Sequence, residues 1–203
     1  MNARIIFSVF LVGIGVIVAL LPVHTPASFL LRSKELLSRS LEEERYISVD
    51  QAAKYINNED STVQFIDLRS EEQFRECNIP GSVNIPYQHL LDPRWDATFH
   101  QKSIKTILYG NGDLTAAHAW TIATGRGYKN MYILKGGLNE WFGTVMLSSF
   151  SGAKITPAEN ARFETRVNAR KAFTQINSLP DSLKSSFFST KRIKQSKLDG
   201  GCE

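Results

Sequence analysis

Residues 107–120 read ILYGNGDLTAAHAW, and this stretch decides the fold. The apolar run 107–109 is typical of a buried strand, and it breaks into Gly-Asn-Gly-Asp before a helix-like segment. A strand that enters a tight loop at a helix N-terminus is a common place for chemistry in α/β proteins. Yet this loop contains no cysteine, arginine, histidine or lysine. It is either an active site without its reactive group or only a turn.

The same alternation extends on both sides of the stretch. It predicts a parallel, doubly wound sheet with helices on both faces, and the loops at the carboxyl ends of its strands form the functional edge. Asp67 and Arg69 lie on that edge, as does the loop at 110–114. Strands are expected at 46–48, 63–67, 83–85, 106–109 and 131–134, and helices near 53–56, 70–74, 115–124 and from 138 onward.

The N-terminus contains an uncharged apolar run, IIFSVFLVGIGVIVALL, at residues 5–21. As a helix it would span about 25 Å, close to the thickness of a bilayer core. Arg4 precedes the run, and residues 22–31 contain no lysine or arginine, so the positive-inside rule places the domain outside the cytoplasm. We expect a single-pass signal anchor. If the source is a Gram-negative bacterium, the folded domain would then lie in the periplasm. The alternative is a cleaved signal peptide, which would release a soluble exported protein.

Four segments follow from composition. We expect the transmembrane or signal segment at 1–22, a linker at 23–45, the folded domain at 46–148, and a C-terminal region at 149–203. In the last region, 157–176 is predicted to form an amphipathic helix that packs on the domain or on a partner. Thr156 is its expected N-cap, with Pro157 and Glu159 in the first turn. The chain from Ser178 onward reads as a flexible basic tail.

The charge and cysteine content exclude some functions. The formal net charge is only +4, so the domain is not expected to bind nucleic acid. The two cysteines, Cys77 and Cys202, fit neither a disulfide scaffold nor a metal site. We expect no metal and no cofactor.

Four stretches resemble motifs of the rhodanese family. Residues 65–74, FIDLRSEEQF, are similar to its DVR-x-x-x-E-F segment, and 134–141, LKGGLNEW, to its L-x-G-G-x-x-x-W. Residues 77–86, CNIPGSVNIP, are similar to G-H-I-P-G-A-x-N-I-P, with Cys77 and Asn78 replacing glycine and histidine; 127–132, GYKNMY, is the fourth stretch. The resemblance covers about 46–145 and implies an α/β fold with a five-stranded parallel sheet and helices on both faces.

In active members of that family, the loop after the fourth strand holds a nucleophilic cysteine, followed by four residues and an arginine. The cysteine takes a sulfane sulfur from a donor such as thiosulfate and becomes a persulfide. Counting back from 127–128 without gaps places the cysteine position at Gly110 and the arginine position at Thr115. The resemblance therefore implies a vestigial active-site loop made of Gly110, Asn111, Gly112, Asp113, Leu114 and Thr115.

Few residues of the loop region offer a substitute for the thiolate. The hydroxyl of Thr115 is a far weaker nucleophile at neutral pH, and His118, one turn further, is more simply a surface or core histidine. Asp113 would repel an anionic donor and is expected to cap the following helix by accepting from its first amides. The alternative is that Asn111, Gly112 and Asp113 recognise a non-anionic ligand or a peptide.

Four residues outside the loop complete the candidates. Cys77 precedes a strand, so we expect it at the amino edge of the sheet, as a structural residue. Cys202 lies in a Gly-Gly-Cys terminus, where it could carry sulfur or be an incidental exposed thiol. Asp67 and Arg69 are expected to form the turn after the second strand, from which Arg69 could lend positive charge to the loop.

The sequence therefore predicts a membrane-anchored rhodanese-like pseudoenzyme: a binding or regulatory module with the sulfurtransferase fold, without catalysis, and with an unidentified protein partner. The binding candidates are Asp67, Arg69, Asp113, Thr115 and His118. The competing hypothesis is a sulfurtransferase or sulfur carrier that uses Cys202, and a third is a scaffold that recruits a partner through residues 150–203.

Overall fold

A computed structural model describes residues 4, 7, 10–14, 30–150, 156–180 and 183. Most of the expected membrane segment at 5–21 lies outside the described residues, as do Cys202 and nearly all of the expected tail. Among the described residues, no helix is both long enough and apolar enough to cross a bilayer.

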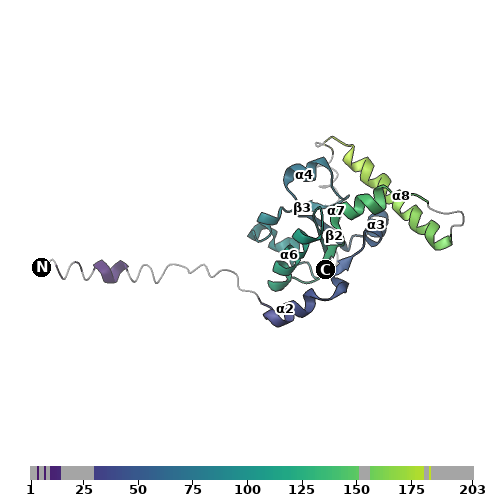
Figure 1. The fold of residues 1–203 in the computed structure, drawn as a ribbon. Coiled ribbons are helices and arrows are strands. Elements are labelled where there is room, and N and C mark those ends of the chain that lie inside the picture. Colours follow the sequence, from purple (N-terminus) through teal and green to yellow (C-terminus); the bar gives the residue numbers. More distant parts are fainter. Residues whose placement is uncertain are drawn as a thin grey trace, which may run out of the picture.

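Five parallel strands form one sheet with the order β1-β5-β4-β2-β3. This confirms the predicted α/β architecture (Figure 1). The strands are β1 (Tyr46–Ile47), β2 (Val63–Asp67), β3 (Val83–Asn84), β4 (Lys105–Tyr109) and β5 (Met131–Leu134). The α-helices are α2 (Ser33–Ser40), α3 (Val49–Asn57), α4 (Glu71–Glu76), α5 (Asp96–Phe99), α6 (Asp113–Gly125), α7 (Gly137–Glu140) and α8 (Pro157–Asn177). Short 3-10 turns are η1 (Glu43–Arg45), η2 (Tyr87–His89) and η3 (Pro93–Trp95), and α7 continues into a π-helical turn, η4 (Trp141–Met146).

The sheet separates two hydrophobic cores because successive side chains of a strand point to opposite faces. In β2, Phe65 belongs to the core under α3, η4 and α8, whereas Ile66 belongs to the core under α6. In β4, Ile107 and Leu108 divide in the same way. Figure 1 shows α3, α7 and α8 together on one side of the molecule.

Local capping explains several helix starts. Ser48 and Ser70 accept hydrogen bonds from the amides of Gln51 and Gln73, at the beginnings of α3 and α4. Thr156 and Glu159 form the reciprocal capping box predicted for α8. These bonds use residues three apart, which is why sequence alone could locate them.

Helix α8 packs on the domain, which is one of the two possibilities that the sequence left open. Its side chains Ala169, Phe173 and Ile176 are buried, and Phe173 lies beside the ring of Trp141. Arg166 forms two hydrogen bonds to the carboxylate of Asp50 on α3, at 2.6 and 2.7 Å. The helix therefore closes one of the two cores.

Candidate functional site

The loop after β4 contains only three residues, Gly110 to Gly112, before α6 begins at Asp113. The N-cap is Gly112, and no side chain caps the helix. The expectation that Asp113 caps α6 is wrong. Its Oδ1 accepts instead from the backbone N–H of Gly136, at 2.6 Å. Because Asp113 is already the first helical residue, its side chain lies past the capping position and reaches the neighbouring turn.

The turn between β5 and α7 holds the loop in place. Backbone N–H groups of Leu138 and Asn139 donate to the carbonyls of Gly110 and Asn111, at 3.0 and 2.9 Å. A Cβ atom on Gly137, whose φ is +57°, would lie 2.6 Å from the Gly110 oxygen. Only glycine therefore allows this approach. The sequence marked Gly136 and Gly137 as a turn, but nothing local to them indicated that the turn supports the loop.

Gly110 itself has room for a side chain. A Cβ atom built there meets no heavy atom closer than 3.7 Å, and the nearest are the Gly112 oxygen and the Thr115 Cβ. Ordinary van der Waals contact begins at about this distance. The geometry of the loop thus accepts a Cβ atom at this buried position, so a clash at Cβ does not explain the glycine.

The other loop residues face solvent. Asn111, Asp113, Leu114 and Thr115 are exposed, and Leu114 is 71% exposed. His118 is also exposed and lies three residues after Thr115, on the same side of α6. The structure therefore exposes Thr115 and His118 on one side of α6, whereas the side chain of Asp113 is directed to the backbone of Gly136.

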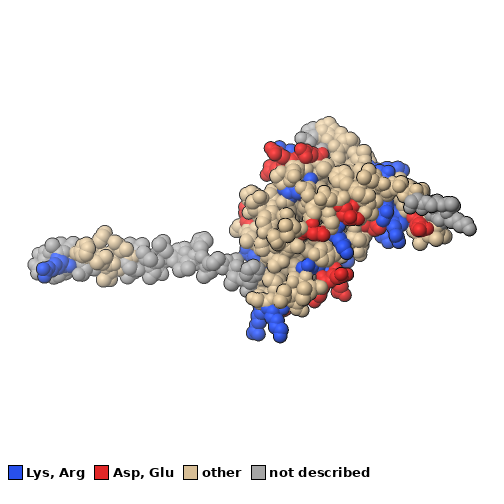
Figure 2. Space-filling model, in the orientation of Figure 1, with Lys and Arg blue, Asp and Glu red and all other residues tan. Residues whose placement is uncertain are grey.

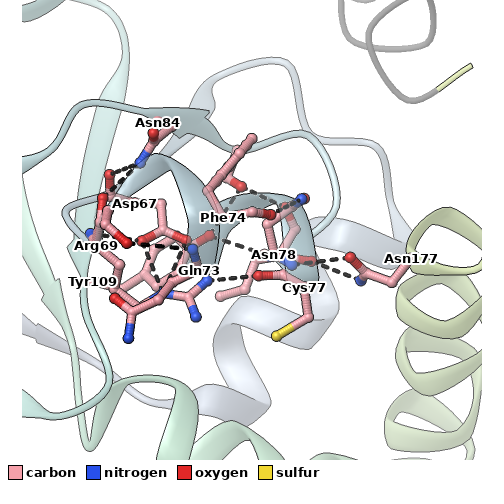
Figure 3. A network of polar contacts seen from close by, with 12 residues as sticks. Asp67, Arg69, Gln73, Phe74, Cys77, Asn78, Asn84, Tyr109 and Asn177 are labelled. Atoms are coloured by element: carbon pink, nitrogen blue, oxygen red, sulfur yellow. Dashed lines mark hydrogen bonds and ion pairs between the residues drawn. The ribbon is translucent and has the colours of Figure 1, made fainter. Parts of the chain in front are cut away.

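Asp67 and Arg69 form a buried ion pair below the loop (Figure 3). The guanidinium donates through Nε and Nη2 to both carboxylate oxygens of Asp67, at 2.7–3.2 Å. Its Nη2 also donates to the Cys77 carbonyl, at 2.6 Å. Burial alone would lower the pKa of Arg69, but the hydrogen bonds and charge of Asp67 outweigh it, so the pKa is raised. The positive charge of Arg69 is therefore paired with Asp67 in the interior. The sequence analysis had instead suggested that it could lend positive charge to the loop.

The phenol of Tyr109 continues this network at the end of β4. It accepts from the backbone N–H of Ile79, at 3.2 Å, and donates to Ser82 Oγ, at 2.9 Å. Burial, reinforced by the negative charge of Asp67, raises the pKa of this phenol well above its ordinary value. Tyr109 therefore stays a neutral structural group directly before Gly110.

Cys77 does not lie at the amino edge of the sheet, where the sequence placed it. Its carbonyl contacts Arg69, two residues beyond the carboxyl end of β2. The reason is that β3 is only two residues long and pairs with the last residues of β2, so the turn before it runs beside that end. The side chain of Cys77 is half-buried, forms no disulfide, and packs against the core under α8. Within the described residues, no cluster of histidine, cysteine and acidic side chains is arranged to hold a metal.

Comparison with known proteins gives a consistent result. The family model for the rhodanese-like domain matches residues 48–144. Thiosulfate:glutathione sulfurtransferase from Saccharomyces cerevisiae is 23% identical over 117 residues, which cover 53% of this chain and 84% of that protein. A solved rhodanese-like domain from Anabaena sp. is 20% identical over 55% of this chain and 89% of its own, with a TM-score of 0.44. Thiosulfate sulfurtransferase from Pseudomonas aeruginosa is 19% identical over 48% of this chain and 18% of its own, with a TM-score of 0.41.

The family match begins just after β1 and ends within η4, so it covers β2 to β5, the loop at Gly110 and the turn at Gly137 that supports it. Residues 48–144 of this chain therefore form a rhodanese-like domain, which is related to sulfurtransferases at low identity.

Proposed function

We propose that this protein is a membrane-anchored rhodanese-like module that lacks sulfurtransferase catalysis and acts by binding a protein partner. The observation that carries the proposal is the position of Gly110. It directly follows β4, where active members of the family are expected to have the cysteine nucleophile, and Thr115 stands where they have arginine. A glycine has no atom with which to form a covalent bond to sulfur.

The surroundings of the loop supply no replacement. Cys77 is packed against the core under α8, and its carbonyl rather than its thiol contacts the Arg69 network. The hydroxyl of Thr115 is a far weaker nucleophile than a thiolate at neutral pH. Asp113 adds a negative charge that an anionic sulfur donor would have to approach.

The exposed residues of the loop support a binding role instead. Leu114 is 71% exposed at the start of α6, between the polar side chains of Asp113 and Thr115. A partner would bury the apolar side chain of Leu114 and could form hydrogen bonds to the polar residues beside it. The apolar segment at 5–21 supports the anchor, with the domain on the outer side of the membrane. Signal cleavage remains the alternative for this segment.

A sulfur carrier that uses Cys202 is the second candidate. It is favoured by the 23% identity to a protein named thiosulfate:glutathione sulfurtransferase. The terminal Gly-Gly-Cys sequence would place the thiol on the chain end rather than in the loop.

The test is an assay of purified full-length protein with thiosulfate as donor and cyanide or glutathione as acceptor. We expect no turnover above the rate without protein, for the wild type and for a Cys77→Ser, Cys202→Ser double variant. Turnover that survives loss of both cysteines would overturn the proposal. A persulfide on Cys202, detected by mass spectrometry and abolished by Cys202→Ser alone, would favour the sulfur carrier.

Binding through the loop is tested by crosslinking on intact source cells. A partner crosslinked to the wild type should be lost with Leu114→Glu and retained with Leu147→Glu. Leu147 is similarly exposed, at 76%, but directly follows η4. Equal retention by both variants would contradict binding through this loop.

A further inference from the structure

Helix α2 presents an apolar face that the domain leaves uncovered. Leu37 and Leu41 are 62% and 77% exposed, and Leu30, just before the helix, is 75% exposed. Residues four apart share one side of a helix, so Leu37 and Leu41 point the same way. The half-buried residues Leu36 and Ser40 lie on the neighbouring side, about 100° around the helix, and α2 contacts α6. Figure 1 places α2 at the lower end of the domain.

The chain joins the domain at a fixed point beside this face. The backbone N–H groups of Leu30 and Leu31 both donate to the carbonyl of Gly125, at 2.8 and 3.3 Å. The Leu30 side chain lies over Gly127, where a Cβ atom would be only 2.9 Å from Leu30 Cδ1. Eight residues, 22–29, separate Leu30 from the end of the apolar segment at Leu21. Even fully extended, they reach about 30 Å, so α2 must lie near the bilayer that this segment enters.

The charges around α2 are distributed unevenly, with basic residues at its beginning and acidic residues after its end. Arg32 and Lys34 are exposed at its beginning and have no carboxylate partner among the described residues, whereas Arg39 pairs with Glu35 at 2.9 Å. Three exposed glutamates follow the helix at 42–44. Figure 2 shows basic side chains projecting from the lower end of the molecule, where Figure 1 places α2. Lipid phosphates are complementary to the beginning of the helix, and the acidic segment belongs on the side away from them.

We propose that α2 lies on the membrane surface, with Leu30, Leu37 and Leu41 among the upper acyl chains and Arg32 and Lys34 at the lipid phosphates. Exposed leucines beside basic residues are the pattern of helices that rest in the membrane interface. The inference depends on the proposed function, because the segment at 5–21 must enter the same bilayer.

This docking orients the candidate site. Helix α6 is 13 residues long, or about 20 Å, with Gly125 at the end near α2 and Asp113 at the other. The strands run parallel, so the loop at Gly110 lies on the edge of the sheet opposite the membrane contact. The surface of Asp113, Leu114 and Thr115 therefore faces water, and its partner must approach from the aqueous side.

The experiment uses full-length protein in vesicles of phosphatidylcholine with a minority of phosphatidylglycerol. Hydrogen exchange of the α2 backbone amides is compared between the wild type and the double variant Leu37→Glu, Leu41→Glu. Both substitutions keep good helix formers at exposed positions. We expect exchange in the wild type to be slower by about tenfold or more, because bilayer contact removes most of two leucine side chains from water. Leu147→Glu changes a similarly exposed leucine directly after η4 and should leave the exchange of α2 unchanged.

The outcomes separate the inference from the function on which it rests. Flotation of the vesicles reports anchoring: if the chain does not float with them, the membrane anchor is wrong. If the chain floats but the α2 amides exchange equally fast in both proteins, the docking of α2 is wrong and the anchor stands. Protection that increases with the number of chains per vesicle would identify a second copy as the occupant and overturn the inference. Leu37→Gln, Leu41→Gln should reproduce the loss of protection without added charge.

Discussion

Asn177, the last residue of α8, binds the backbone of Asn78 with both ends of its side-chain amide. Its Oδ1 accepts from the Asn78 N–H and its Nδ2 donates to the Asn78 carbonyl, each at 2.9 Å. Asn78 adjoins Cys77, whose carbonyl accepts from Arg69 (Figure 3). The C-terminal helix is thereby joined to the ion pair beneath the candidate site, by a contact between residues 99 positions apart.

Replacing Asn177 by alanine should destabilise the domain by about 1–3 kcal/mol. The backbone of Asn78 would lose both partners, and a buried polar group without a partner costs this much. The measurement is the free energy of unfolding in urea. Asn160→Ala is the matched control, because Asn160 lies on the same helix but its amide contacts only the exposed Glu164. Equal effects of the two substitutions would show that the hydrogen bonds between Asn177 and Asn78 contribute no stability of their own.

Replacing Asp50 by asparagine should cost about 1 kcal/mol at neutral pH, and this cost should disappear in acid. Hydrogen bonds from Arg166 lower the pKa of Asp50 below its ordinary value of 3.8. A carboxyl with a lowered folded-state pKa stabilises the fold above its unfolded-state pKa, and the contribution is lost as pH falls through the folded-state value. Unfolding of the wild type and Asp50→Asn should therefore differ at pH 7 and converge below pH 3.8. Glu35→Gln, which breaks an exposed i,i+4 pair with Arg39, should cost less than about 0.5 kcal/mol. A gap that persists in acid would contradict this account.

Replacing Gly137 by alanine should destabilise the domain by about 2–4 kcal/mol and displace the loop at Gly110. The new Cβ would lie 2.6 Å from the Gly110 oxygen, on a backbone with φ of +57°. Gly143→Ala is the control, since a Cβ there meets nothing within 4 Å and its backbone is not left-handed. Thermal unfolding measures stability, and amide chemical shifts of 110–113 report the loop. A loop that keeps its shifts in Gly137→Ala would mean that the turn does not support it.

Replacing Gly110 by cysteine should give a folded protein with an acidified thiol. The Cβ has 3.7 Å of clearance, and the thiolate would sit at the uncapped start of α6, where backbone amides stabilise negative charge. In a background without Cys77 and Cys202, the rate of iodoacetamide alkylation against pH measures the thiol pKa. We expect a lower pKa than for Gly143→Cys, which lies in the middle of η4, and a further decrease when Thr115→Arg is added. Equal pKa values at 110 and 143 would mean that the loop no longer stabilises an anion.

Sequence reasoning succeeded where the signal is local. The five strands were located because apolar runs of about five residues separate capped helices, and β5 lies at the predicted 131–134. The capping box of Thr156 and Glu159 and the cap at Ser70 join residues three apart. The family motifs are likewise short, contiguous stretches, and the family match at 48–144 agrees with them.

It failed where a side chain had two possible partners. The carboxylate of Asp113 could accept a hydrogen bond either from an amide of its own helix or from the distant backbone of Gly136. It accepts from Gly136 because α6 begins one residue earlier than a cap at Asp113 requires. Cys77 was misplaced because a strand of only two residues cannot carry the preceding turn to the far edge of the sheet.

The sequence by itself determined the order of strands, loops and helices along the chain, and that a glycine directly follows β4. Both follow from periodicity and short motifs, which act over a few residues. Only the tertiary structure decided that Arg69 binds Asp67 and the Cys77 carbonyl, and that Asn177 binds Asn78. It also decided that residue 137 must lack a side chain, because a Cβ atom there would collide with the loop at Gly110. Those contacts depend on how the sheet brings distant segments together, and side-chain directions across such distances are settled by packing.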